Sequence, residues 1–210
     1  LLVLLNQDTI VLPGWLDGLI EALESDVCVG LVGSMLLAPS GQLQEAGGVV
    51  WADGSALNVG RGDDPLRPGY RHRRDVDYCS GASIALRTEL WRRLGGFDER
   101  YAPAYYEDTD LAFRMREAGL RVVYEPSSQV IHVEGVTCGT SAYAGVKRHQ
   151  TLNQPRFVGR WHRELATHGT STARPPNFMD RARARRVLVL DAELPTPDRD
   201  SGSIDAVNLL

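Results

Sequence analysis

The sequence LLVLLNQDTIVLPGWLDGLIEALES, residues 1–25, contains a short apolar run, a polar cluster and an amphipathic segment in succession. The run from Leu1 to Leu5 is continuously apolar, which is typical of a strand buried on both faces of a sheet. Pro13-Gly14 then opens a helix that ends near Ser25. The apolar stripe of this helix consists of Leu16, Leu19, Ile20 and Leu23. A strand, a polar tip and a helix in this order predict an α/β fold.

The rest of the chain continues this alternation. The segments predicted as strands are residues 27–37, 44–51, 76–87, 121–124 and 129–133, the last two joined by a turn at Pro126. The segments predicted as helical are 88–94, which Gly95 ends, 111–118, which Gly119 ends, and part of 141–165. Residues 58–77 contain three Gly, two Pro and five Arg without periodicity, which predicts a surface loop.

Composition allows one sizeable core and an appendage. The chain has 210 residues, of which 43% are hydrophobic, so a domain of ordinary size can form. We expect a first domain at 1–165, a polar linker at 166–182, and a truncated second α/β domain at 183–210 that opens with the apolar run at 187–190. Because the chain begins without Met inside a predicted buried strand, we also expect that upstream nucleotide-binding units are missing.

Charge and cysteine content exclude several classes of protein. The net charge of −4 argues against a nucleic-acid partner for the whole chain. Cys28, Cys79 and Cys138 are widely separated, which is neither a disulfide framework nor a zinc site and fits a reducing compartment. No apolar run reaches the length of a transmembrane segment. We therefore expect a cytoplasmic location, including the inner face of the cell membrane.

The most informative polar stretch is Tyr105-Tyr106-Glu107-Asp108-Thr109-Asp110-Leu111. Its acids precede an amphipathic helix, where free backbone N–H groups and the macrodipole favour an ionised carboxylate. Such a carboxylate can be a helix cap, a metal ligand or a general base. For a lone Asp the cap is the default interpretation.

Two other polar points stand at predicted strand ends, Asn6-Gln7-Asp8 and His132. Taken singly, Asp8 can cap the following turn and His132 can be a hydrogen-bonded core residue. Together with the acidic helix start, they predict a divalent cation held by oxygen and imidazole, with a carboxylate base nearby. Oxygen-rich ligands with one imidazole suit Mn²⁺ or Mg²⁺.

Five segments resemble the family-2 inverting glycosyltransferases of GT-A fold: NQDT, LQEAGG, YCSGASIALR, LGGFDERYAPAYYEDTDLAFRMREAGLRVVYEP and VIHVEG. The resemblance covers residues 1–161 and preserves the order of the motifs. It implies a Rossmann-like mixed sheet flanked by helices, a nucleotide-sugar donor and a carbohydrate or lipid-linked glycan acceptor.

The resemblance also assigns roles to residues near the donor. Asp8 matches the second acid of the family's D-x-D element and would bind the metal that bridges the donor diphosphate. Asn6 replaces the first acid, so one carboxylate is missing. His132 would complete the metal site. Lys147 and Arg148 would contact the phosphates, although a solvated helix face is the alternative.

On the acceptor side, Asp108 matches the second residue of the E-D motif and would be the general base, while Glu107 would orient the acceptor. The side chains of Tyr105 and Tyr106 could stack on sugar rings. At Ser80-Gly81 the backbone could approach the sugars because Gly lacks a side chain, and a strand bulge is the alternative.

We therefore expect an inverting glycosyltransferase that is part of a larger enzyme for a bacterial surface glycan, and little transfer by this chain alone. The tail RRVLVLDAELPTPDRDSGS resembles the start of a GT-B type domain. The alternatives are a carbohydrate-binding remnant without transfer chemistry and a metal-dependent nucleotidyltransferase.

Overall fold

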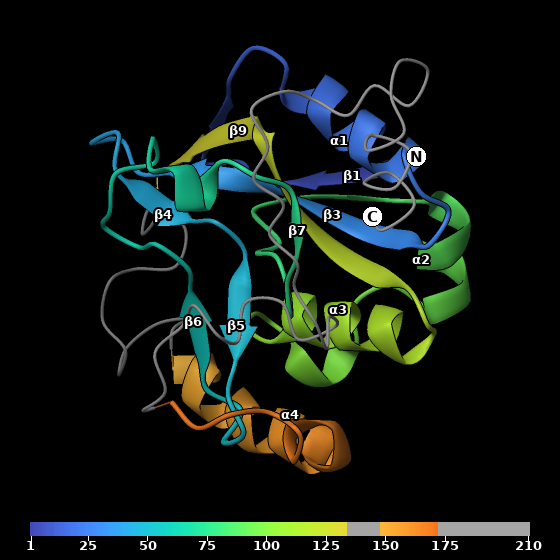
Figure 1. The fold of residues 1–210 in the computed structure, drawn as a ribbon. Coiled ribbons are helices and arrows are strands. Elements are labelled where there is room, and N and C mark those ends of the chain that lie inside the picture. Colours follow the sequence, from blue (N-terminus) through green and yellow to red (C-terminus); the bar gives the residue numbers. More distant parts are fainter. Residues whose placement is uncertain (134–147, 172–210) are drawn as a thin grey trace, which may run out of the picture.

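The computed structural model describes residues 1–133 and 148–171, and its centre is a mixed β-sheet (Figure 1). The sheet runs in the order β1-β8-β3-β9-β2, with β4 added to β3 and β7 added to β9. The strand bounds are β1 Leu2–Leu5, β2 Thr9–Val11, β3 Val29–Leu37, β4 Leu43–Glu45, β7 Arg74–Asp75, β8 Ser83–Leu86 and β9 Arg121–His132. Only β3 and β9 pair in parallel, and the other described pairs of this sheet are antiparallel.

Helices cover both faces of the sheet, as predicted. Helix α1 (Trp15–Glu24) lies on one face and α3 (Glu107–Glu117) on the other (Figure 1). Helix α2 (Thr88–Leu94) follows β8, and α4 (Arg148–Leu165) lies beyond α3, beside the hairpin of β5 (Gly48–Val50) and β6 (Ala56–Asn58). The predicted α/β class is confirmed.

Strand β3 lies at the centre of the core, and every residue in it is buried. Its side chains alternate, so that Val32 faces Leu19 and Leu23 of α1, whereas Leu31 belongs to the cluster that contains α3. Each fully buried Leu contributes about 1.5–3 kcal/mol. Gly33 is required at its position, since an added Cβ would lie 2.2 Å from Cys79 Cβ.

The first predicted strand differs from expectation in its burial. Within the described part of the sheet, β1 is an edge strand that pairs antiparallel with β8, and Leu1 and Leu5 remain 58% and 42% exposed. A continuous apolar run does not distinguish a central from an edge strand, because both can carry it.

Three other predicted strand boundaries were wrong. Segment 44–51 divides into β4 and β5 at Gly47, which has φ +74°. Regular pairing in segment 76–87 begins only at Ser83. The two strands predicted around Pro126 form one strand, β9, with a bulge where the register against β3 passes from Glu125 to Gln129. Proline is tolerated there because a bulge leaves ladder positions unpaired.

The predicted loop at 58–77 is largely irregular, with a 3-10 turn at Pro68–Tyr70. One of its arginines is buried, contrary to a simple surface loop. Arg74 donates to the carbonyl of Ala46 at 2.6 Å and lies 4.5 Å from the ring centre of Tyr124. These contacts anchor the loop beside the sheet.

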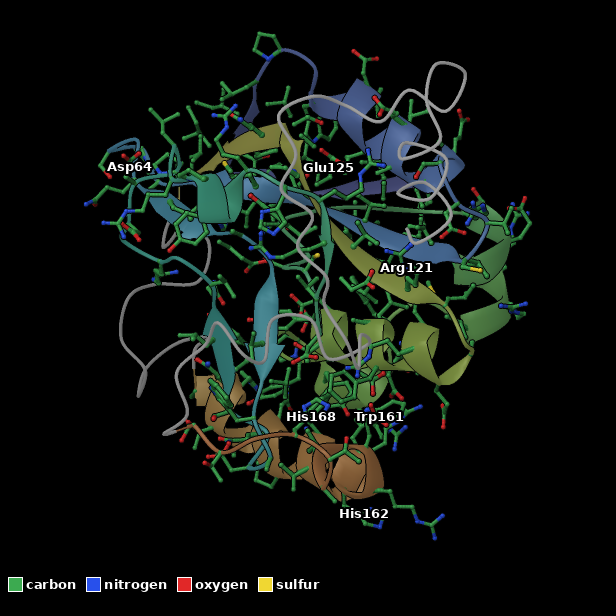
Figure 2. The ribbon with its side chains drawn as sticks, in the orientation of Figure 1. Asp64, Arg121, Glu125, Trp161, His162 and His168 are labelled. Atoms are coloured by element: carbon green, nitrogen blue, oxygen red, sulfur yellow. The ribbon has the colours of Figure 1, made fainter. Side chains whose placement is uncertain are left out.

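Helix α4 closes the α3 side of the domain. Phe157 and Trp161 pack against Phe113 of α3, with ring centres 4.9 and 5.4 Å apart. His168 follows the helix and is also buried (Figure 2). Its ring centre lies 5.6 Å from that of Phe113, and its Nδ1 lies 2.7 Å from the carbonyl oxygen of Val50. The folded part thus reaches into the segment predicted as a linker. The division at 166–182 and 183–210 stays a prediction because residues 172–210 lie outside the described part.

Within residues 1–133 and 148–171, no helix has the length and apolar character that crossing a membrane requires.

Candidate active site

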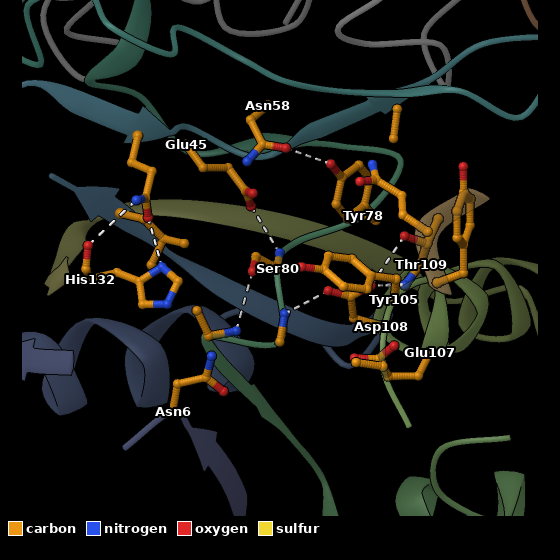
Figure 3. Close-up of a pocket in the computed structure, with 18 of the residues that line it drawn as sticks. Asn6, Glu45, Asn58, Tyr78, Ser80, Tyr105, Glu107, Asp108, Thr109 and His132 are labelled. Carbon is orange, nitrogen blue, oxygen red and sulfur yellow. Dashed lines mark hydrogen bonds between the residues drawn. The ribbon is translucent and has the colours of Figure 1, made fainter. Parts of the chain in front are cut away.

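An open cleft of about 990 Å³ gathers most of the polar residues singled out from the sequence. Its walls come from the β1–β2 turn, β4, the turn before β8, the start of α3 and the end of β9. The predicted residues that line it are Asn6, Asp8, Ser80, Gly81, Tyr105, Tyr106, Glu107, Asp108 and His132. In Figure 3, Ser80 lies between His132 on one side and Asp108 on the other.

Asp8 and His132 form one end of the cleft. Thr9 pairs with His132 across β2 and β9, and the amide of Val133 donates to the Asp8 carbonyl at 2.9 Å. This pairing brings Asp8 Oδ1 to 3.4 Å from His132 Nε2. The two side chains predicted to share a cation therefore lie close together at this end of the cleft.

Gln44 of β4 orients His132 from the other side. Its Oε1 lies 2.8 Å from His132 Nδ1, and its Nε2 donates to the His132 carbonyl at 3.4 Å. An amide oxygen accepts, so Nδ1 carries the hydrogen and a neutral ring turns the lone pair of Nε2 toward Asp8. The Nε2 lone pair of His132 and the carboxylate oxygen of Asp8 repel each other, and either a proton or a cation between these two atoms removes the repulsion.

The residues present fit a divalent cation of the predicted kind. The described residues hold no group of three or more His, Cys, Asp or Glu side chains arranged around one metal position. Mg²⁺ and Mn²⁺ sites that act on phosphates commonly use only one or two protein ligands and complete the shell with substrate oxygens. Asp8 and His132, with Gln44 as the supporting residue, match that chemistry.

The acidic helix begins after a strained stretch of backbone. Tyr105 and Tyr106 both have φ +73°, a left-handed conformation that costs a non-glycine residue about 1–2 kcal/mol. Asn153 of α4 compensates, because its buried Nδ2 lies within 3.0 Å of the carbonyls of Tyr101, Ala104 and Tyr105. Helix α4 thus sets where α3 starts.

Asp108 is held at both carboxylate oxygens. Oδ1 accepts from the backbone N–H of Thr109 at 2.6 Å and from its hydroxyl, while Oδ2 accepts from the Gly81 N–H at 2.9 Å. The contact with Thr109 satisfies a backbone amide of the helix, and the contact with Gly81 joins the helix to the opposite wall of the cleft. Capping alone therefore does not describe Asp108, because one oxygen fixes it across the cleft.

The pKa values of the adjacent acids Glu107 and Asp108 correct one expectation. Burial raises the pKa of Asp108 despite its three hydrogen bonds. Burial, followed by repulsion from Asp108, raises the pKa of Glu107 to about 8. The helix start was expected to favour the ionised form, but removal of water outweighs the helix dipole here. Each of the two carboxylates is therefore more basic than an exposed one.

The third acid of the cluster, Asp110, is structural. It is fully buried, pairs with Arg114 Nε at 2.7 Å, and accepts hydrogen bonds from Trp161 Nε1 and Tyr101. It joins α3 to α4 and faces away from the cleft lining.

The turn at Ser80-Gly81 is not a strand bulge, because it precedes β8. A Cβ on Gly81 would lie 3.5 Å from Asp108 Cβ, an ordinary contact, so the glycine is not sterically required. The backbone contributes instead: Gly81 donates to Asp108, and the Ala82 carbonyl accepts from the Asn6 N–H at 3.0 Å.

The two tyrosines differ in their surroundings. Tyr106 is 6% exposed, donates from its hydroxyl to the Gly54 carbonyl and packs on Phe157, which makes it mainly a core residue at the cleft floor. Tyr105 is half-buried in the cleft wall. Of the phosphate candidates, Lys147 lies outside the described residues, and Arg148 is exposed and is not among the lining residues.

Sequence reasoning missed several lining residues, chiefly Gln44, Glu45, Asn58 and Tyr78. Tyr78 donates to Asn58 Oδ1 at 2.7 Å, and Glu45 accepts from the Ser80 N–H at 2.8 Å. Gln44 and Glu45 belong to the segment LQEAGG, to which the family resemblance assigns no site residue.

Comparison with known proteins gives consistent results. A family model described as glycosyltransferase like family 2 matches residues 1–151. The O-antigen biosynthesis protein RfbC of Myxococcus xanthus is 36% identical over 143 residues, which is 65% of this chain. An N-acetylglucosaminyl-diphospho-decaprenol L-rhamnosyltransferase of Mycobacterium tuberculosis is 28% identical over 204 residues, 88% of this chain. The chain spans 11% and 65% of the lengths of these relatives.

Among solved structures, that of GalNAc-T7 with UDP, GalNAc and Mn²⁺ superposes with a TM-score of 0.56. The match covers 78% of this chain and 32% of the other, at 15% identity, and so bears on the fold alone.

Proposed function

Because this chain belongs to glycosyltransferase family 2, we propose that it transfers a sugar from a nucleotide-sugar donor to a hydroxyl group of a carbohydrate or lipid-linked glycan, with inversion. The observation that carries the proposal is the opposition, in one cleft, of the Asp8–His132 pair and the fixed carboxylate of Asp108. Inversion needs this opposition, since the acceptor attacks from the face opposite the leaving nucleotide.

At the donor end, Asp8 and His132 would hold a divalent cation, Mn²⁺ or Mg²⁺. When bound, such an ion neutralises the charge that develops on the departing diphosphate. Asn6 lies at the same end and offers a neutral amide in place of a carboxylate. The cation affinity of the free protein is therefore weak, and donor phosphates contribute to it.

At the acceptor end, Asp108 removes the proton of the attacking hydroxyl. Its hydrogen bonds with Gly81 and Thr109 fix the carboxylate, and its raised pKa makes it a better proton acceptor. A positioned base contributes roughly 10²- to 10⁴-fold in rate. Glu107, half-buried in the same wall, orients the acceptor.

The names of the relatives favour one substrate class. L-Rhamnose and a polyprenyl diphosphate appear in the name of the relative that aligns with 88% of this chain, and O-antigen biosynthesis in another. We take a nucleoside-diphosphate rhamnose as the first donor to test, a lipid-linked bacterial glycan as the acceptor, and the inner membrane face as the place of reaction.

Calorimetry tests the donor end independently of turnover. UDP, GDP and dTDP, each with Mn²⁺, are titrated into the protein and into Asp8→Asn and His132→Ala. We expect each variant to weaken binding of the best nucleotide at least about tenfold, since a ligand of the cation is lost. His162→Ala is the matched control, because His162 points into solvent (Figure 2). Equal affinities in all four proteins would refute the donor site.

Asn6 also favours a second candidate, a carbohydrate-binding remnant without transfer chemistry. Both candidates predict glycan binding, but only a transferase releases nucleoside diphosphate in proportion to glycosylated acceptor. Glycan binding without such release, across the donor panel, would support the remnant.

A further inference from the structure

Glu45 and Asp108 hold consecutive amides of one turn. Glu45 is the last residue of β4, and its Oε1 accepts from the Ser80 N–H at 2.8 Å. The next amide, that of Gly81, donates to Asp108 Oδ2 at 2.9 Å. Figure 3 shows the two acids reaching this turn from different elements. A shift of the turn on one side therefore moves the hydrogen-bond donor on the other.

The surroundings of Glu45 are those of a neutral carboxyl group. The residue is 1% exposed, and its Oε2 is buried without a hydrogen-bond partner among the described residues. Within the same part of the chain, no Arg, Lys or His approaches Glu45 to ion-pair distance. A buried carboxylate with one hydrogen bond and no ion pair is strongly disfavoured relative to the protonated acid.

We propose that Glu45 is a positioning residue that acts in its protonated form and keeps Asp108 in place through the Ser80-Gly81 turn. This inference rests on the proposed role of Asp108 as the base. Glu45 itself need not touch the substrate.

The charged groups around Glu45 agree with this assignment. Those that act on it or feel its charge are Asp108 of α3, Tyr78 and Cys79 before β8, Arg61 after β6, and Tyr124 of β9. Burial and, to a smaller extent, repulsion from Asp108 raise the pKa of Glu45 to about 8, against the opposing effects of the Ser80 amide and Arg61. The proton is thus retained at neutral pH and lost in mild alkali, where two anions then share the turn.

The pH dependence of stability tests the proton without any activity assay. A carboxyl group whose pKa is raised on folding stabilises the fold below its unfolded pKa of 4.5 and loses that contribution as pH rises toward about 8. From about pH 5 to about pH 8, the unfolding constant of the protein should therefore rise more steeply than that of Glu45→Gln, by up to about tenfold per pH unit. Glu89→Gln on the exposed face of α2 is the control. Parallel curves for the protein and Glu45→Gln would overturn the proposal.

Kinetics test the link to Asp108. Neither variant can ionise at position 45. Glu45→Gln keeps an oxygen that accepts from the Ser80 amide, whereas Glu45→Ala removes this acceptor as well. We expect Glu45→Ala to lower kcat by about tenfold or more and Glu45→Gln to recover most of it, with the alkaline fall in rate moved upward by about one pH unit or more. Equal losses in the two variants, or an alkaline fall that does not move, would refute the proposal.

If the unsubstituted protein transfers no sugar from any donor in the panel, the proposed function fails by itself. Carboxyl ¹³C NMR then decides the present inference, with the Asp108 signal assigned by Asp108→Asn. We expect Glu45→Ala to shift the Asp108 titration and Glu45→Gln to leave it in place below about pH 8. An Asp108 titration that is the same in all three proteins would remove the coupling through the turn.

Discussion

Asp108→Asn is the sharpest test of the chemistry because the substitution preserves shape while removing the base. Asp108 accepts hydrogen bonds at both oxygens, from Thr109 and from Gly81. An asparagine has one acceptor oxygen, so its NH₂ group must face one of these N–H donors. The unpaired donor costs about 1–3 kcal/mol. Asparagine also avoids the burial cost of a carboxylate, so we expect a net change in unfolding free energy of about 1 kcal/mol or less.

The effect on catalysis should be much larger than the effect on stability. Loss of a positioned base lowers kcat by roughly 10²- to 10⁴-fold, equivalent to about 3–5 kcal/mol of transition-state stabilisation. Nucleotide binding should be retained, because the Asp8–His132 end of the cleft is separate.

Three measurements on the same preparation test these expectations: initial rates of glycosylated product, calorimetric affinity for a nucleoside diphosphate with Mn²⁺, and urea unfolding. Asp17→Asn, on the exposed side of α1, is the matched control. Undiminished sugar transfer by Asp108→Asn would refute the base assignment. Equal losses of nucleotide affinity and rate would show instead that the substitution disrupts the donor end.

Three further predictions concern the supports of the site. Asp110→Asn should lower the unfolding free energy by about 3–5 kcal/mol, measured by urea denaturation, because it leaves the buried Arg114 without its ion-pair partner. Asn153→Ala should cost about 1–3 kcal/mol by the same measurement and also lower kcat, since three carbonyls before α3 lose their donor; Gln154→Ala, whose exposed amide serves one carbonyl, is the control. Gly81→Ala should fold with stability within about 1 kcal/mol of the parent and raise the acceptor KM, because its methyl group enters the cleft beside Asp108.

The sequence predicted those elements whose pattern is local. Both bounds of α1 match the prediction, but its buried face consists of Gly18, Leu19, Ala22 and Leu23, and Leu16 of the predicted stripe is 42% exposed. β3 was predicted because a long run of branched apolar residues favours a buried strand, and all residues of β3 are buried. The edge position of β1 and the bulge in β9 depend on which strand lies alongside, and no local pattern records that neighbour.

The candidate site was predictable to a similar extent. Asp8, His132 and Asp108 stand where elements begin or end, positions that periodicity locates well. The different roles of Asp108 and Asp110 were not predictable, since they depend on which side of α3 meets Trp161 of α4. The protonation of Glu107 was misjudged for a related reason: the helix dipole can be inferred from sequence, but the amount of water that the fold removes cannot.

The small residues Ser80-Gly81-Ala82 connect these findings. Within this turn, the Ser80 amide donates to Glu45 and the Gly81 amide donates to Asp108. The carbonyl of Ala82 accepts from the backbone N–H of Asn6 at the donor end. Each of these contacts uses backbone atoms, so substitutions in the turn change its shape more than its chemistry. If donor binding shifts Asn6 by even a fraction of an ångström, the same peptide units carry that shift to the carboxylate that accepts the proton. Backbone hydrogen bonds at three consecutive residues of this turn therefore connect the donor end of the cleft with the carboxylate of Asp108.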